Sequence, residues 1–142
     1  WDLLEFDAHT ILRDYVKALN HLYQKEPALY ALDNDSNGFE WINDTAANES
    51  IVSFLRKTER KEDTLLIICN FTPVSYDKYR TGVPCAGDYV KVLSSDDEKF
   101  GGTGANIKKT IKAEKIECEG KDYSIEFNLP PMSVTVFKFD YK

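Results

Sequence analysis

The sequence has few of the residues that usually build a metal or redox site. Its 142 residues include two histidines and three cysteines. Cys69, Cys85 and Cys118 lack the close spacing that zinc ligands use, so we predict no metal site. An odd number of cysteines does not complete a disulfide framework, which favours a reducing, cytoplasmic environment.

The sequence also lacks the features of a membrane protein or a nucleic-acid-binding protein. No apolar run approaches the roughly 20 residues that a membrane-spanning helix needs. The formal net charge is −6, and the basic residues are dispersed along the chain, so a nucleic acid would be repelled. We therefore expect no membrane and no nucleic-acid partner. The chain begins at Trp1 with neither an initiator methionine nor a signal peptide, and we expect it to be a piece of a longer protein.

The first part of the chain has the pattern of one amphipathic helix. Its apolar residues recur at helical spacing between residues 11 and 23. They are Ile11, Leu12, Tyr15, Val16, Leu19, Leu22 and Tyr23. We expect Asp7 to cap the helix and Pro27 to end it. This broad apolar stripe needs a partner that covers it, and the turn-forming residues 33–38 indicate a domain boundary behind it.

From Phe39 onward the hydrophobic pattern has the short period of β-strands. The expected strands are residues 39–41, 51–55, 65–69, 79–83, 89–93, 111–118, 123–129 and 133–139. Residues 65–69 are almost continuously apolar, as expected of a strand that is covered on both faces. The fold class predicted is therefore mainly β, an antiparallel β-sandwich of about eight strands with Greek-key connections, preceded by one α-helix.

No catalytic or cofactor-binding constellation emerges from the residues. Gly101, Gly102 and Gly104 are not followed by the Lys-Ser/Thr pair and helix of a phosphate-binding loop, so we interpret them as a structural turn. The carboxylates lie mostly in expected turns, and no pair of them is nominated for glycoside cleavage. We predict no catalytic residue and no cofactor in this chain.

Aromatic side chains are the remaining candidates for ligand contact, because sugar rings have apolar C–H faces on which they stack. Phe39 and Trp41 share one face of an expected strand, and Glu40 points to the other. These two residues either contact a glucan or fill the junction between sandwich and helix. Tyr79 is a weaker candidate for the same contact.

Several short segments, taken in order, carry a resemblance to a known family. They are residues 15–23, 38–42, 70–74, 79–84, 100–104 and 129–133. This series resembles the C-terminal region of bacterial 1,4-α-glucan (glycogen) branching enzymes, which belong to the α-amylase family. The resemblance covers the whole chain in order. It implies that residues 1–32 are the last helix and linker of an absent catalytic (β/α)₈ barrel, and that residues 33–142 are the C-terminal sandwich.

The resemblance further implies that the longer enzyme transfers an α-1,4-glucan segment to a 6-hydroxyl and so forms α-1,6 branches in glycogen. Its paired catalytic carboxylates lie on barrel strands upstream of Trp1. The expected partners of this fragment are an α-glucan and its own barrel, with Trp41, Phe39 and Tyr79 as glucan contacts. The alternatives are the same domain of an amylase or debranching hydrolase, a free-standing carbohydrate-binding module, and an immunoglobulin-like interaction domain.

Overall fold

The computed structural model describes residues 6–43, 50–105 and 107–140, which form one long α-helix and eight antiparallel strands. The elements are α1 (Asp7–Lys25), β1 (Phe39–Asn43), β2 (Ile51–Arg56), β3 (Leu65–Asn70), β4 (Tyr76–Val83), β5 (Asp88–Ser94), β6 (Thr110–Lys112), β7 (Tyr123–Leu129) and β8 (Ser133–Phe139). One sheet has the order β1-β2-β3-β8-β5-β6, and β4 and β7 form the second. The predicted helix followed by an antiparallel sandwich is confirmed.

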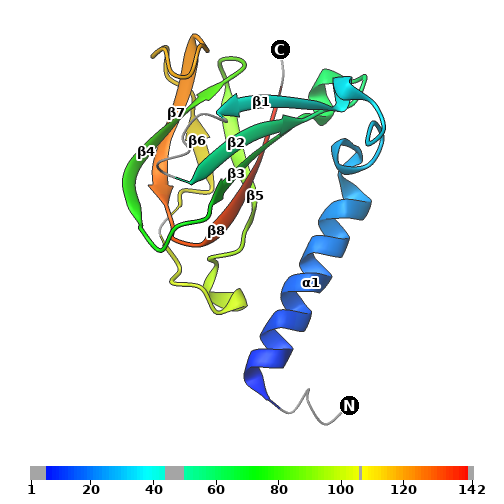
Figure 1. Ribbon diagram of the computed structural model, residues 1–142, viewed down its shortest axis with the longest axis vertical. Helices are drawn as coiled ribbons and strands as arrows, with labels where there is room; N and C mark the ends of the chain where they lie inside the picture. The colour runs from blue at the N-terminus through cyan, green and yellow to red at the C-terminus, as the bar shows by residue number, and fades with distance from the viewer. Residues whose placement is uncertain (1–5, 44–49, 106, 141–142) are drawn as a thin grey trace.

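Three layers result from this arrangement. The β4–β7 pair covers one face of the six-stranded sheet, and α1 lies on the other side of that sheet (Figure 1). The N-terminal half of α1 extends past the ends of the strands (Figure 1). No helix within the described ranges is long and apolar enough to cross a membrane.

Strand β3 belongs to both hydrophobic cores of the domain. Leu66 and Ile68 point into the core between the two sheets, and Leu65, Ile67 and Cys69 point toward the helix. All five side chains are buried, since successive residues of a strand face opposite sides of the sheet. The continuous apolar run in the sequence therefore corresponds to a central strand covered on both faces, as predicted.

The ends of α1 differ in part from the prediction. Asp7 does not cap the helix: it is the first helical residue, and Phe6 at the cap position makes no side-chain hydrogen bond. The acidic side chain of Asp7 still suits the positive end of the helix dipole. The C-terminal end is as predicted, because Glu26 is the cap residue and Pro27 begins a separate 3₁₀ turn.

The strand expected at residues 111–118 is wrong in its length, because the chain changes sheets there. Strand β6 ends at Lys112, and the Ala113 N–H donates to the carbonyl of Gly87 beside β5 at 2.9 Å. The next residue, Glu114, bonds instead to Ser124 at the start of β7. A hydrophobic period does not reveal which strand a residue pairs with, so this crossing was not visible in the sequence.

A buried amide connects the two loops at one end of the sandwich. The Asn70 side chain, 1% exposed, donates to the carbonyls of Val74 at 2.9 Å and Pro130 at 2.8 Å. Its Oδ1 accepts from the Thr72 N–H at 3.0 Å and the Thr72 hydroxyl at 2.8 Å. All the hydrogen-bonding capacity of this amide is therefore used to hold the loop after β3 against the turn before β8.

We expect Asn70→Ala to lower the free energy of unfolding by about 3 kcal/mol, because it removes four hydrogen bonds and leaves buried partners unsatisfied. The measurement is chemical denaturation followed by circular dichroism. Asn20→Ala, on the exposed face of α1, is the matched control and leaves stability nearly unchanged. Equal stability of the two variants would contradict this role for Asn70.

Candidate functional site

Strands β1 and β2 bring three aromatic rings together on the helix-facing side of the large sheet. Trp41 lies directly opposite Phe54 in the ladder, and Phe39 is two residues away on the same face. The ring centroids are 4.7 Å apart for Phe39–Trp41, 5.1 Å for Phe39–Phe54 and 5.8 Å for Trp41–Phe54. We call these three residues the aromatic cluster. Trp41 is 50% exposed, so it offers one ring to solvent.

Glu40 fixes strand β1 from the opposite face. Its carboxylate accepts from the Lys57 ammonium at 2.9 Å and the Lys121 ammonium at 2.7 Å. The hydrogen bond from Lys121 has the largest effect and lowers the pKa of Glu40; the Lys57 bond adds to it against the opposing effect of burial. The two ion pairs anchor β1 on one side, and the alternation of the strand then directs Phe39 and Trp41 to the other.

The aromatic cluster lies close to the segment that joins helix and sandwich. Arg56, opposite Phe39 in the ladder, donates to the carbonyls of Ala28 at 3.2 Å and Leu29 at 3.4 Å. It also pairs with the carboxylate of Asp33. The guanidinium therefore holds the linker against the end of β2, beside the cluster.

Tyr79 lies in a different part of the molecule from the other two candidates. Its ring packs with Tyr76 and Phe127, both at 6.2 Å between centroids, against the core between the two sheets. Phe54 of the aromatic cluster packs on the other face of the large sheet. The structure thus brings Phe39 and Trp41 together and leaves Tyr79 apart. Phe54 was missed because the sequence does not reveal the cross-strand register.

The chemistry available to the aromatic cluster is contact rather than catalysis. The stacked rings of Phe39 and Phe54, with Trp41 edge to face against both, offer an apolar platform on which the C–H face of a sugar or an apolar side chain packs. Among the residues that the structure describes, no group of three or more His, Cys, Asp or Glu side chains is arranged to hold a metal ion. Three free cysteines are present, of which Cys69 is buried, and burial raises the pKa of its thiol.

The apolar stripe of α1 divides into two in the structure. Tyr15, Ala18 and Leu22 pack against the outer face of the large sheet. Ile11 is partly buried and lies near Gly101. The four remaining residues form what we call the outer stripe: Leu12, Val16, Leu19 and Tyr23, which are 59%, 46%, 36% and 50% exposed. Their spacing places them on one side of the helix. The sheet therefore covers only part of the predicted stripe.

A shallow apolar groove continues the outer stripe onto the sheet. It has a volume of about 370 Å³ and lies between α1 and the outer face of β8 and β5. Leu19 and Tyr23 line it from the helix, and Leu93, Val134 and Val136 line it from the strands. Stripe and groove together form an apolar surface of the kind that marks a protein contact.

The glycine-rich loop is structural, as predicted. Gly101 and Gly104 have φ angles of +78° and +68°, which glycine adopts without strain. A Cβ on Gly102 would overlap the backbone of Asp96. The loop presents Phe100 to Tyr15 of α1, with ring centroids 5.1 Å apart, and so supports the N-terminal half of the helix.

Asp96 holds this loop closed with a single carboxylate. It accepts from the Thr103 N–H at 2.9 Å, the Thr103 hydroxyl at 2.7 Å and the Ala105 N–H at 3.0 Å. Burial, the largest single effect, raises the pKa of Asp96, but these hydrogen bonds and the charge of Lys91 together outweigh it and lower the pKa below its ordinary value.

Proteins similar to the whole length of the chain are known. Residues 41–140 match the family described as the alpha amylase C-terminal all-beta domain. The chain is 45% identical over its full length to the 1,4-alpha-glucan branching enzyme GlgB of Butyrivibrio fibrisolvens, of which it covers 22%. It is 40% identical to the enzyme of the same name from Halothermothrix orenii and 42% to that of Rubrobacter xylanophilus, with 97% and 96% of the chain aligned. These alignments cover 22% and 19% of the two relatives, so the chain spans about a fifth of the length of the curated relatives it matches.

Because the pKa of Asp96 is lower in the folded state, its carboxylate stabilises the fold at neutral pH, and this contribution disappears as the pH falls below about 4. We expect Asp96→Asn to lower the free energy of unfolding by about 2 kcal/mol at pH 7. On acidification the variant then loses less stability than the wild type does. Denaturation curves at several pH values measure both effects. Asp77→Asn, an exposed carboxylate on β4, is the control. A parallel pH dependence of Asp96→Asn and wild type would exclude this role.

Proposed function

The chain belongs to the family of α-amylase C-terminal all-β domains, and we propose that it is the C-terminal domain of a 1,4-α-glucan branching enzyme. The similarity to branching enzymes over the whole chain, including the helix in front of the sandwich, carries this proposal. The enzyme transfers an α-1,4-glucan segment to a 6-hydroxyl and forms an α-1,6 branch. We place its catalytic carboxylates in the part of the enzyme that lies outside this chain.

The first role that we propose is to stabilise the catalytic barrel. The outer stripe and the adjoining groove are apolar, and neither is filled by the described residues of this chain. About four-fifths of the length of the relatives lies outside the aligned region, so a covering partner is available within the same protein. Residues 1–32 then act as the last barrel helix with its linker, and residues 33–142 as the sandwich behind it.

The coupling between helix and sandwich supports this role. The carboxylate of Glu26, 1% exposed, accepts from the Lys138 ammonium of β8 at 2.6 Å. Together with Arg56 at the linker, this ion pair holds the C-terminal end of the helix, and the contact of Tyr15 with Phe100 of the glycine-rich loop holds its middle. Because the helix is held in this way, a barrel that packs on the outer stripe has a fixed position relative to the sandwich.

The second role that we propose is contact with an α-glucan, at Trp41 with Phe39 behind it. The exposed ring of Trp41 and its place beside the linker support this role. A glucan held there would be kept at a raised effective concentration near the barrel. Tyr79 is a weaker candidate, because its ring is half-buried against the core.

We also propose that the enzyme is cytoplasmic. The free cysteines support this environment.

We expect Leu12→Glu/Val16→Glu to destabilise the full-length enzyme by about 3 kcal/mol, because the outer stripe is then unable to be buried against the barrel. In the 142-residue chain the same variant leaves the melting temperature almost unchanged, since both side chains are exposed. Lys17→Glu/Gln24→Glu on the polar face of α1 is the matched control. Differential scanning calorimetry of both proteins measures the difference, and equal losses in the two would contradict docking through this stripe.

We expect Trp41→Ala to weaken the binding of glycogen about tenfold, which corresponds to about 1.4 kcal/mol, because the exposed stacking surface is removed. Trp41→Phe retains part of the affinity. Affinity electrophoresis in gels that contain glycogen measures the effect. Phe71→Ala, which removes another exposed ring far along the chain, is the control. Unchanged retardation of Trp41→Ala would exclude the aromatic cluster as a glucan contact.

A further inference from the structure

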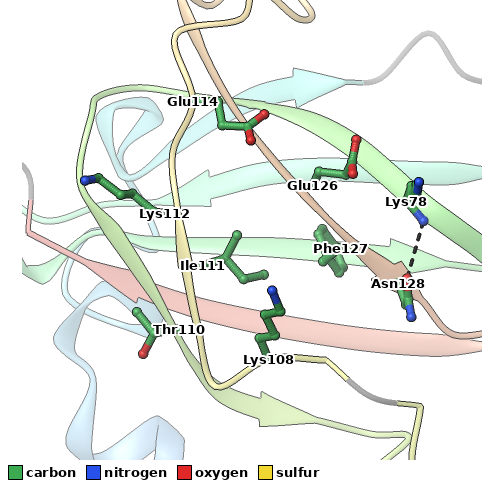
Figure 2. Close-up of a pocket in the computed structure, with 9 residues that line it drawn as sticks. All are labelled: Lys78, Lys108, Thr110, Ile111, Lys112, Glu114, Glu126, Phe127 and Asn128. Carbon is green, nitrogen blue, oxygen red and sulfur yellow. Dashed lines mark hydrogen bonds between the residues drawn. The ribbon is translucent and has the colours of Figure 1, made fainter.

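A second hollow, which is lined mainly by polar residues, opens where the two sheets part. It has a volume of about 610 Å³, within the range of about 300 to 1,000 Å³ that is usual for ligand sites. Its walls are the edge of β6 and the edge of β7 (Figure 2). We call it the β6–β7 seam, formed by Lys108, Thr110 and Lys112 on one side and by Glu126 and Asn128 on the other.

The seam exists because β6 and β7 are joined at one point and then separate. Glu114 and Ser124 exchange two backbone hydrogen bonds, at 2.9 and 3.0 Å. Beyond that bridge, β6 pairs with β5 and β7 pairs with β4. Since Lys109 and Ala113 bond toward β5, the alternation of an antiparallel ladder directs the backbone groups of Thr110 and Lys112 toward β7. The seam is thus bordered by backbone donors and acceptors.

The floor of the seam is apolar. Ile111 and Phe127 point inward between their polar neighbours and belong to the core, with 8% and 6% of their surface exposed. They are visible at the bottom of the hollow in Figure 2. A ligand that lies in the seam therefore meets an apolar base and polar walls.

Two carboxylates line the seam, those of Glu114 and Glu126, and both form ion pairs with the same arginine. Arg80 pairs with Glu114 at 2.8 Å and with Glu126 at 2.9 Å, and it donates to the Ser124 hydroxyl at 2.9 Å. One guanidinium therefore offsets part of the charge of the two carboxylates and keeps their acceptor oxygens at fixed positions on the wall. Because lysines and carboxylates both line the seam, its charges are of mixed sign.

The other polar groups of the seam are suited to hydroxyls. Lys108 points toward the middle of the hollow, whereas Lys112 points away from it (Figure 2). The Oδ1 of Asn128 accepts from the backbone N–H of Lys78 at 3.4 Å. The two side-chain N–H donors of Asn128 are then left for a ligand. Together with the backbone groups of Thr110 and Lys112, these groups offer both donors and acceptors around an apolar floor.

We propose that the β6–β7 seam is a binding site for a neutral α-glucan chain, separate from the aromatic cluster. This inference rests on the proposed function, because that function brings the domain into contact with glucan. The sugar places an apolar ring face on the floor and its hydroxyls against Lys108, Asn128 and the backbone of Thr110. Trp41 lies on the opposite face of the large sheet from the core that forms this floor, so the two contacts are independent.

Titration of the ¹⁵N-labelled chain with maltoheptaose, followed by NMR, tests the proposal. We expect the Asn128 side-chain amide and the backbone amides of Thr110 and Lys112 to shift on titration. Lys108→Ala/Asn128→Ala weakens the affinity for the seam roughly fivefold to tenfold, because two hydrogen bonds to the ligand are lost. Lys17→Ala/Asn20→Ala removes the same two side-chain types from the exposed face of α1 and leaves the affinity unchanged.

The possible outcomes distinguish this site from the proposed function. Shifts confined to the Trp41 indole would overturn the seam and leave the proposed function in place. No shift at any position would overturn both glucan contacts but not barrel docking, which the outer-stripe variants test separately. Stronger shifts at the seam with inorganic phosphate than with maltoheptaose would replace the glucan by an anion and so refute the proposal. The wild-type shifts map the site even where a variant fails to fold.

Discussion

The central sheet of this domain is apolar on both faces, and each face needs a cover. Leu65, Ile67 and Cys69 of β3 would be exposed to water if α1 were absent, and Leu66 and Ile68 would be exposed without the β4–β7 pair. Burial of apolar surface is the main favourable contribution to folding, so the three-layer arrangement follows from this one strand and its neighbours. The helix is thus one of the two covers that this sheet needs.

Polar contacts then fix the covers in place rather than driving their association. Glu26 with Lys138 and Arg56 with the linker carbonyls hold α1 at its C-terminal end. Asp96 holds the glycine-rich loop that supports its N-terminal half. Each of these groups satisfies hydrogen bonds that would otherwise be lost at the boundary between the layers. These contacts orient the outer stripe relative to the sheet, as the proposed docking to a barrel requires.

The surfaces proposed for function lie in three different places. The outer stripe lies along the exposed side of α1, the aromatic cluster lies at the linker, and the β6–β7 seam opens where the two sheets part. Each is a place where the layered arrangement leaves an edge or a face without a cover. Such edges are where the contacts that we propose, with a glucan and with a catalytic barrel, are available.

The sequence by itself determined most of the elements: the helix that ends before Pro27, the strand periodicity from Phe39 and the two-sided burial of residues 65–69 all followed from hydrophobic period and turn residues. Local pattern also predicted that Phe39 and Trp41 share a face. Tertiary structure alone decided the rest, because pairing and packing join residues far apart in the chain. It placed Phe54 beside Trp41, moved Tyr79 to another core, ended β6 at Lys112 and left half of the helical stripe uncovered.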